Sequence, residues 1–229
     1  MAAGKGPTSR EMPELIRTMS GQITARIREK ILAGIYPPGS ALLQDVIAAE
    51  FGVSKIPVRE ALVQLRAEGL VDVFAHRGFQ VRPLSSEEVD EVFKLRLQIE
   101  PTAIADGARL ATDEDHEATR LAFANLNDAL LAGGELHESG DLNRTFHISL
   151  IVPRIQPVTA GILNRLHALS QRYVRMHLLP PGRVQRANQE HAALYEAWMS
   201  RNTAETQRLT HAHIETARDD LAQLLRSSS

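Results

Sequence analysis

Apolar side chains recur at every third or fourth position through the first part of the chain, which predicts three short helices. The first covers about 20–33 and ends before the turn sequence YPPGS. The second covers about 44–51 and is stopped by a glycine. The third has Ser54 as its expected N-cap, a residue type favoured at helix starts, and ends at Gly69. These three helices are too short to be stable alone and are expected to pack together.

After residue 70 the pattern changes to alternation around the tripeptide HRG, which predicts a β-hairpin with Gly78 in its turn. From residue 85 onward every long stretch returns to the helical period and none reads as a strand. Pro101 lies inside the first of these helices and is expected to kink or split it. The expected helices cover about 86–110, 113–132, 139–152, 157–179, 184–200 and 203–226.

Three helices followed by a hairpin is the element order of a winged helix-turn-helix. We therefore expect a mainly α-helical protein in which this unit is joined to an all-α bundle of six helices. The expected organisation is a disordered tail over 1–15, a winged helix-turn-helix domain over 16–84 and a helical domain over 85–229.

Composition narrows the function classes. The chain has no cysteine, which excludes disulfides, thiolate metal sites and cysteine nucleophiles. No apolar run approaches the roughly 20 residues that cross a bilayer, and the first residues hold no apolar segment of a secretory signal, so a cytoplasmic protein is expected. The net charge of −2 divides unevenly: residues 1–84 hold 11 basic and 8 acidic side chains, and the remainder holds 15 and 20. A basic first part hints at a nucleic-acid partner.

The third helix and the hairpin carry the candidate DNA contacts. In a helix-turn-helix the second helix of the motif presents polar and basic residues from its first turns to the DNA, and a wing tip can reach a phosphate or the minor groove. The alternative is a solvated helix face beside an unremarkable hairpin. The candidates are Ser54, Lys55, Arg59, Gln64, Arg66, His76, Arg77 and Gly78.

The run PGSALLQDVIAAEFGVSKIPVREALVQLRAEGLV resembles the DNA-binding signature of the GntR family of bacterial repressors, with GVS, PVREAL and AEGLV intact. The resemblance implies that Lys55 and Arg59 touch bases and phosphates, that Ser54 holds a phosphate, and that the wing contacts the minor groove. Two positions depart from the family pattern. Lys55 stands where arginine is usual, and Asp45 stands where an arginine often faces DNA, so the operator sequence stays open.

The second part of the chain resembles the all-helical FCD ligand-binding domain of the FadR branch of that family. The matching segments share a looser similarity and are spread along the whole domain. They are Leu95-Arg96, Glu100-Pro101, DLNRTFHISL, Glu190-His191 and AHIETAR.

Histidines offer a candidate metal site in the same region. Asn143 and His147 are four residues apart and share one helix face. His211 and His213 are two apart, and the apolar stripe of the last helix favours His213 as the inward one. Imidazole nitrogens suit a borderline ion such as Zn²⁺ or Ni²⁺. Surface histidines, or core histidines satisfied by water, are the alternative reading.

The FCD resemblance implies a divalent metal held by Asn143, His147, His191 and His213. The first ligand is usually aspartate, and an amide oxygen in its place lowers the expected metal affinity. Arg96 is the family-matched cation beside the pocket, and Arg172 or Arg175 could add another, so an organic acid is the expected effector.

The expected function is therefore a homodimeric repressor released from a palindromic operator by that acid. Two rivals stay open: a dimeric DNA binder without an effector, and a metallohydrolase. The second is not expected, because Glu190 is the only carboxylate close in sequence to the histidines and should point elsewhere.

Overall fold

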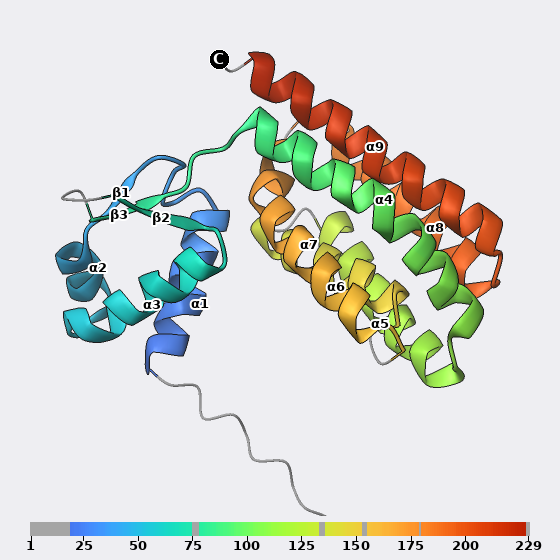
Figure 1. Ribbon diagram of the computed structural model, residues 1–229, viewed down its shortest axis with the longest axis horizontal. Coiled ribbons are helices and arrows are strands. Elements are labelled where there is room, and N and C mark those ends of the chain that lie inside the picture. The colour runs from blue at the N-terminus through green and yellow to red at the C-terminus, as the bar shows by residue number, and fades with distance from the viewer. Residues whose placement is uncertain (1–18, 75–77, 133–135, 153–154, 179, 228–229) are drawn as a thin grey trace, which may run out of the picture.

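The computed structural model describes residues 19–74, 78–132, 136–152, 155–178 and 180–227 (Figure 1). The predicted tail over 1–15 and the wing-tip residues His76 and Arg77 lie outside this part of the chain. The elements follow in the order α1 (Met19–Leu32), β1 (Ala41–Leu42), α2 (Gln44–Phe51), α3 (Lys55–Ala67), β2 (Val71–Phe74), β3 (Gly78–Val81), α4 (Ser86–Leu110), α5 (Asp113–Leu131), α6 (Leu136–Leu150), α7 (Pro157–Leu178), α8 (Arg183–Met199) and α9 (Thr203–Ser227).

The first unit packs α1, α2 and α3 against a small antiparallel sheet in the order β1-β3-β2. The hairpin register sets Val71 opposite Val81, and β1 adds Ala41 opposite Gln80. The core is made by one face of α1, the inner face of α3 and alternate strand positions. Leu62 and Leu65 are fully buried there, which stabilises the unit by about 1.5–3 kcal/mol for each side chain.

The regular elements of the second unit are all helices in the part of the chain that the structure describes, and α4 and α9 lie side by side along it (Figure 1). Helix α7 packs against α4 and α6, while α8 packs against α9 and α5. A separate hydrophobic core fills the space between these helices. The mainly α fold with a winged helix-turn-helix before a helical bundle confirms the fold class predicted from the sequence.

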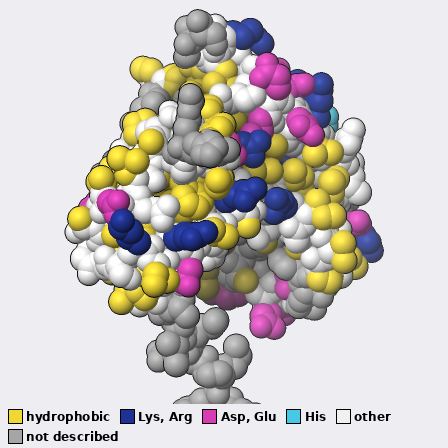
Figure 2. Space-filling model, turned by 60° about the vertical axis from the view of Figure 1, so that its left-hand side comes forward, with side chains coloured by type: hydrophobic (Ala, Val, Ile, Leu, Met, Phe, Trp, Pro, Cys, Tyr) yellow, Lys and Arg dark blue, Asp and Glu magenta, His cyan; other side chains and the backbone are white. Residues whose placement is uncertain are grey.

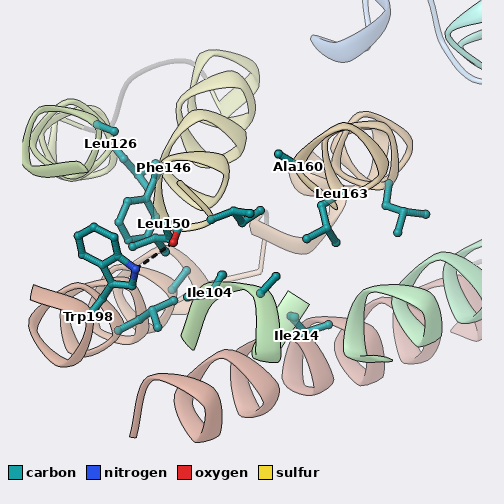
Figure 3. Close-up of a cluster of buried hydrophobic side chains, with 14 of the residues drawn as sticks. Ile104, Leu126, Phe146, Leu150, Ala160, Leu163, Trp198 and Ile214 are labelled. Carbon is teal, nitrogen blue, oxygen red and sulfur yellow. Dashed lines mark hydrogen bonds between the residues drawn. The ribbon is translucent and has the colours of Figure 1, made fainter. Parts of the chain in front are cut away.

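Helices α4, α6 and α8 meet at the carbonyl oxygen of Leu150. Trp198 of α8 is fully buried, and its Nε1 donates a hydrogen bond of 2.9 Å to the carbonyl oxygen of Leu150 at the end of α6 (Figure 3). Gly107 of α4 lies against the same oxygen, since a Cβ at that position would fall 2.0 Å from it. A glycine is required there because only a residue without a side chain lets α4 approach α6 so closely.

Most predicted boundaries agree with the structure to within three residues, with two corrections. Helix α4 continues through Pro101, which is buried, and is not split. Strand β1 was not predicted, since two residues are too short for a period-2 pattern. The expected caps include Thr112, whose backbone N–H donates to Asp115, and Asn202, which accepts from the N–H of Glu205. None of the described helices is both long enough and apolar enough to traverse a bilayer.

Candidate DNA-contact surface and candidate metal centre

The turn between α2 and α3 directs the outer face of α3 away from the core. Gly52 ends α2 in the left-handed region with φ of 65°, and its N–H bonds back to the last turn of that helix. Helix α3 then begins after Ser54 and buries Val58, Leu62 and Leu65 against the other helices. Its opposite side is exposed, which is the arrangement a helix needs to enter a DNA groove.

Lys55 and Arg59 lie one turn apart on this exposed side. The Lys55 ammonium forms an ion pair with Asp45 of α2, and both side chains are exposed. Arg59 has no ion pair among the described residues. Ser54 occupies the N-cap position, but its side chain makes no capping hydrogen bond. Asp45, the carboxylate found where family members often have an arginine, is therefore held beside the Lys55 ammonium.

Two of the other predicted contacts lie elsewhere or at the edge of this surface. Gln64 is on the flank of α3 that faces α1, with its amide 3.3 Å from both Thr24 and Glu68, so it does not join Arg59. Gly78 begins β3 with φ of 76° at the base of the wing. Seen from this side of the molecule, Lys and Arg side chains form several separate groups among exposed hydrophobic ones (Figure 2).

The three predicted histidines converge from three helices. His147 of α6, His191 of α8 and His213 of α9 each bring a ring nitrogen within 4.8 Å of the others. The ring centroids of His191 and His213 are 4.7 Å apart, and His147 lies 5.2 Å from His213. His211 is exposed on the other side of α9, as its spacing predicted. Asn143 lies one turn before His147 on α6, and it lines a cavity together with His191 and His213.

The ring nitrogens are left available for a further ligand. Both nitrogens of His147 and of His191 are buried without a hydrogen-bond partner among the described residues. Nδ1 of His147 approaches Oε1 of Glu100 to 3.1 Å, but without the alignment of a hydrogen bond. Nδ1 of His213 lies 2.7 Å from Oε2 of Glu190, so a ring that donates there presents Nε2 on its other side.

Burial keeps the imidazoles of His147 and His191 neutral. It lowers the pKa of His147 to about 3 and lowers the pKa of His191 well below its usual range, with the neighbouring histidines acting in the same direction. Neutral imidazole is the form that binds a metal. Burying an unpartnered nitrogen costs free energy, and an ion that coordinates one nitrogen of each ring would remove part of that cost. The donor set therefore fits a divalent metal that favours nitrogen ligands.

A buried ion-pair network lies beneath the histidines, and most of it was not predicted. Nε of Arg96 donates to Glu100 at 2.8 Å, and Nη1 donates to Ser170 at 3.3 Å. His167 lies 3.0 Å from the same Glu100 carboxylate. Burial raises the pKa of Glu100, but the Arg96 charge and the contact with His167 outweigh it and hold that pKa well below its usual range. The i, i+4 spacing of Arg96 and Glu100 was visible in the sequence, whereas nothing marked His167.

The cavity beside the histidines measures about 50 Å³ and lies between α4, α5, α6, α7, α8 and α9. Its polar lining is Arg96, Asn143, Arg144, His167, Ser170, Gln171, His177, His191 and His213. Because a buried water needs roughly 10–15 Å³ on this measure, the cavity has room for about three to five water-sized groups.

Arg172, one of the two predicted second cations, is not part of this lining. Arg172 points to the junction of the two units, where it donates to the carbonyl oxygens of Gly69 at 3.1 Å, of Arg82 at 2.8 Å and of Pro83. Arg172 therefore lies between the two domains and not in the cavity. The side chain of Arg175 lies outside the described residues.

Two family models match the chain, and together they span nearly all of it. Residues 19–81 match the bacterial regulatory proteins of the gntR family, and residues 91–216 match the FCD domain. The chain belongs to the GntR family and carries an FCD domain. Both the resemblance noted in the sequence and the expectation that the protein is not an enzyme are thereby confirmed, because the matched domains and relatives are transcriptional regulators.

Similar proteins agree with this assignment. The chain is 29% identical over 130 residues to the HTH-type transcriptional regulator YdhC of Bacillus subtilis (strain 168), covering 57% of this chain and 58% of that one. It is 27% identical over 198 residues to the HTH-type transcriptional repressor GlaR of Escherichia coli (strain K12), covering 83% and 90%. The solved structure of McbR/YncC of E. coli has the same fold, with a TM-score of 0.74 at 19% identity over 93% of this chain and 99% of that one.

Proposed function

We propose that this GntR-family regulator is a homodimeric repressor that a small organic acid, bound beside a divalent metal, releases from a palindromic operator. The observation that carries the proposal is the convergence of His147, His191 and His213 beside a cavity in the FCD domain, with both nitrogens of His147 and of His191 unpartnered among the described residues. The DNA target implies a cytoplasmic protein. We place the domain boundary at 84–85, between the two separate hydrophobic cores.

At the DNA end, Lys55 and Arg59 are the proposed readers of one half-site, with Ser54 and the helix N-terminus beside a phosphate. Both long side chains are exposed on α3, which supports this role. The wing residues around Gly78 are proposed to contact the minor groove. A palindromic site needs two such helices related by a two-fold axis, so the proposal includes a second copy of the chain.

At the effector end, the proposed metal is Zn²⁺ or Ni²⁺, held by His147, His191 and His213 with the amide oxygen of Asn143. Glu190 holds the ring of His213, as carboxylates do behind many metal-binding histidines. When bound, the ion supplies an open coordination position for a carboxylate or hydroxyl oxygen. The small cavity beside this site favours an acid of few carbon atoms.

Helix α7 connects the two ends. His167 and Ser170 on one side of it contact the network of Arg96 and Glu100. Arg172 on the other side holds carbonyl oxygens of the DNA-binding unit and the linker. An acid that changes the packing of α7 would thus bias how the DNA-binding unit is held, and the repressor would lose affinity by a shift of population.

A matched pair of variants on α9 tests the proposal. Purified wild-type protein, His213→Ala and His211→Ala are compared for metal content and for anisotropy titration on DNA from upstream of their own gene. We expect His213→Ala to lose metal and the response to acids while it keeps DNA affinity without acid. His211→Ala should behave as wild type, because that ring is exposed.

Two results would contradict the proposal. Equal metal content in the two variants would mean that the inward histidines do not hold an ion. A wild-type protein whose DNA affinity no carboxylic acid changes would instead support the rival, a dimeric DNA binder without an effector. The DNA half is tested separately by Arg59→Ala, which should lose specific binding while Arg109→Ala, exposed on α4, should not.

A further inference from the structure

Two arginines line the cavity, Arg96 and Arg144. They differ in how far a neighbouring carboxylate neutralises their charge. Arg96 is buried, with 5% of its surface exposed, and it donates two hydrogen bonds to Glu100 and one to Ser170. Its charge is therefore balanced by a carboxylate within the protein. An effector carboxylate placed against Arg96 would also meet Glu100, and like charges at that distance repel.

Arg144 has a different environment. It follows Asn143 on α6, and 35% of its side chain is exposed. Its ion pair among the described residues is with Asp141 at 4.0 Å, the outer limit of such a contact, and the guanidinium donates no hydrogen bond to a described residue. Asp141 in turn accepts a hydrogen bond of 2.7 Å from Gln171 of α7. The five N–H donors of Arg144 are thus available to a ligand.

Arg144 also stands where two spaces meet. Arg144 and Gln171 line both the cavity and a wider groove between the two units. The opposite wall of that groove is formed by the DNA-binding unit, through Arg28, Gln64 and Glu68. A ligand anchored by Arg144 would therefore lie at the boundary that any signal to the DNA-binding unit must cross.

We propose that Arg144, and not Arg96, is the cation that anchors the effector's carboxylate, and that this anchor sets the specificity for short acids. The proposal rests on the function proposed above. One end of the acid faces the histidine site and its carboxylate takes the bidentate fork of Arg144, the geometry in which guanidinium and carboxylate bind most strongly. The cavity of about 50 Å³ favours a short acid.

Calorimetric titration of Zn²⁺-reconstituted protein with acetate, glycolate, lactate and malonate tests this assignment. For the acid that wild type binds most tightly, Arg144→Met should weaken binding about 10- to 100-fold, the range of a lost charge-assisted bond pair. Arg144→Lys should recover part of the affinity. Arg120→Met, which removes an exposed arginine paired with Glu117 on α5, should bind as wild type. Zinc content should be equal in all four proteins.

Three other results would each contradict a different part of the proposal. If Arg144→Met binds the acid as tightly as wild type, Arg144 is not the anchor, although the proposed function stands. If that variant loses zinc together with the acid, Arg144 acts by supporting the histidine site and the anchoring role is wrong. If wild type binds none of the four acids, the proposed effector class fails, and the anchoring role fails with it.

Discussion

Gly107→Ala is expected to destabilise the FCD domain although alanine is the better helix former. The new Cβ would fall 2.0 Å from the carbonyl oxygen of Leu150 and 3.1 Å from its carbon, and both are backbone atoms that cannot rotate away. Helix α4 must therefore move away from the end of α6. The same oxygen accepts the indole N–H of Trp198, so that movement also loosens a buried hydrogen bond.

The sign of the effect follows from three magnitudes. Replacing glycine by alanine inside a helix gains about 1 kcal/mol. Overpacking of a well-filled core costs about 1–3 kcal/mol. A buried donor left without its acceptor costs about 1–3 kcal/mol more. The two costs outweigh the gain, and the free energy of unfolding should fall by about 1–5 kcal/mol.

Urea denaturation followed by tryptophan fluorescence measures this change directly, because Trp198 is the only tryptophan in the chain and lies at the perturbed contact. Far-UV circular dichroism recorded in parallel separates unfolding of the two units. Gly161→Ala is the matched control: it lies in α7, and its Cβ would meet nothing within 4 Å. That variant should gain about 0.5–1 kcal/mol. A Gly107→Ala protein as stable as Gly161→Ala would refute the reasoning.

Three further changes probe the site, the DNA surface and the domain junction. Glu190→Gln weakens the acceptor for the ring N–H of His213 and should lower metal affinity about 10- to 100-fold in a chelator competition; unchanged affinity would mean that this contact does not orient the ligand. Asp45→Asn frees the Lys55 ammonium for a phosphate, so DNA binding should tighten and the slope of log K against log salt should steepen by about 1, whereas weaker binding would contradict the assignment. Arg172→Met removes the hydrogen bonds to the linker, at a cost of about 1.5–3 kcal/mol, and limited proteolysis should cut the linker faster than in wild type; an equal cutting rate would show that other contacts hold the junction.

The spacing of apolar residues and the capping residues account for most of what could be predicted from the sequence. The helical period and the capping residues placed the helices, and the run from Gly52 to Val71 predicted a helix-turn-helix whose buried face is the one observed. The helical period also predicted that His213, and not His211, faces inward, because the direction of a side chain on its own helix depends only on spacing. Family and fold were therefore available before any coordinates, and the convergence of three histidines was implied by the FCD resemblance.

Only the tertiary structure decided which helices face one another, and thus which side chains meet. Gln64 and Arg172 are both polar and suitably spaced, yet each faces the junction between the units and not the site it was predicted to join. His167 and Glu190 acquired roles through partners 67 and 23 residues away, which no local pattern encodes. The physical reason is that helical period fixes a direction relative to one axis, whereas a site depends on how several axes pack, and packing is decided by the whole core.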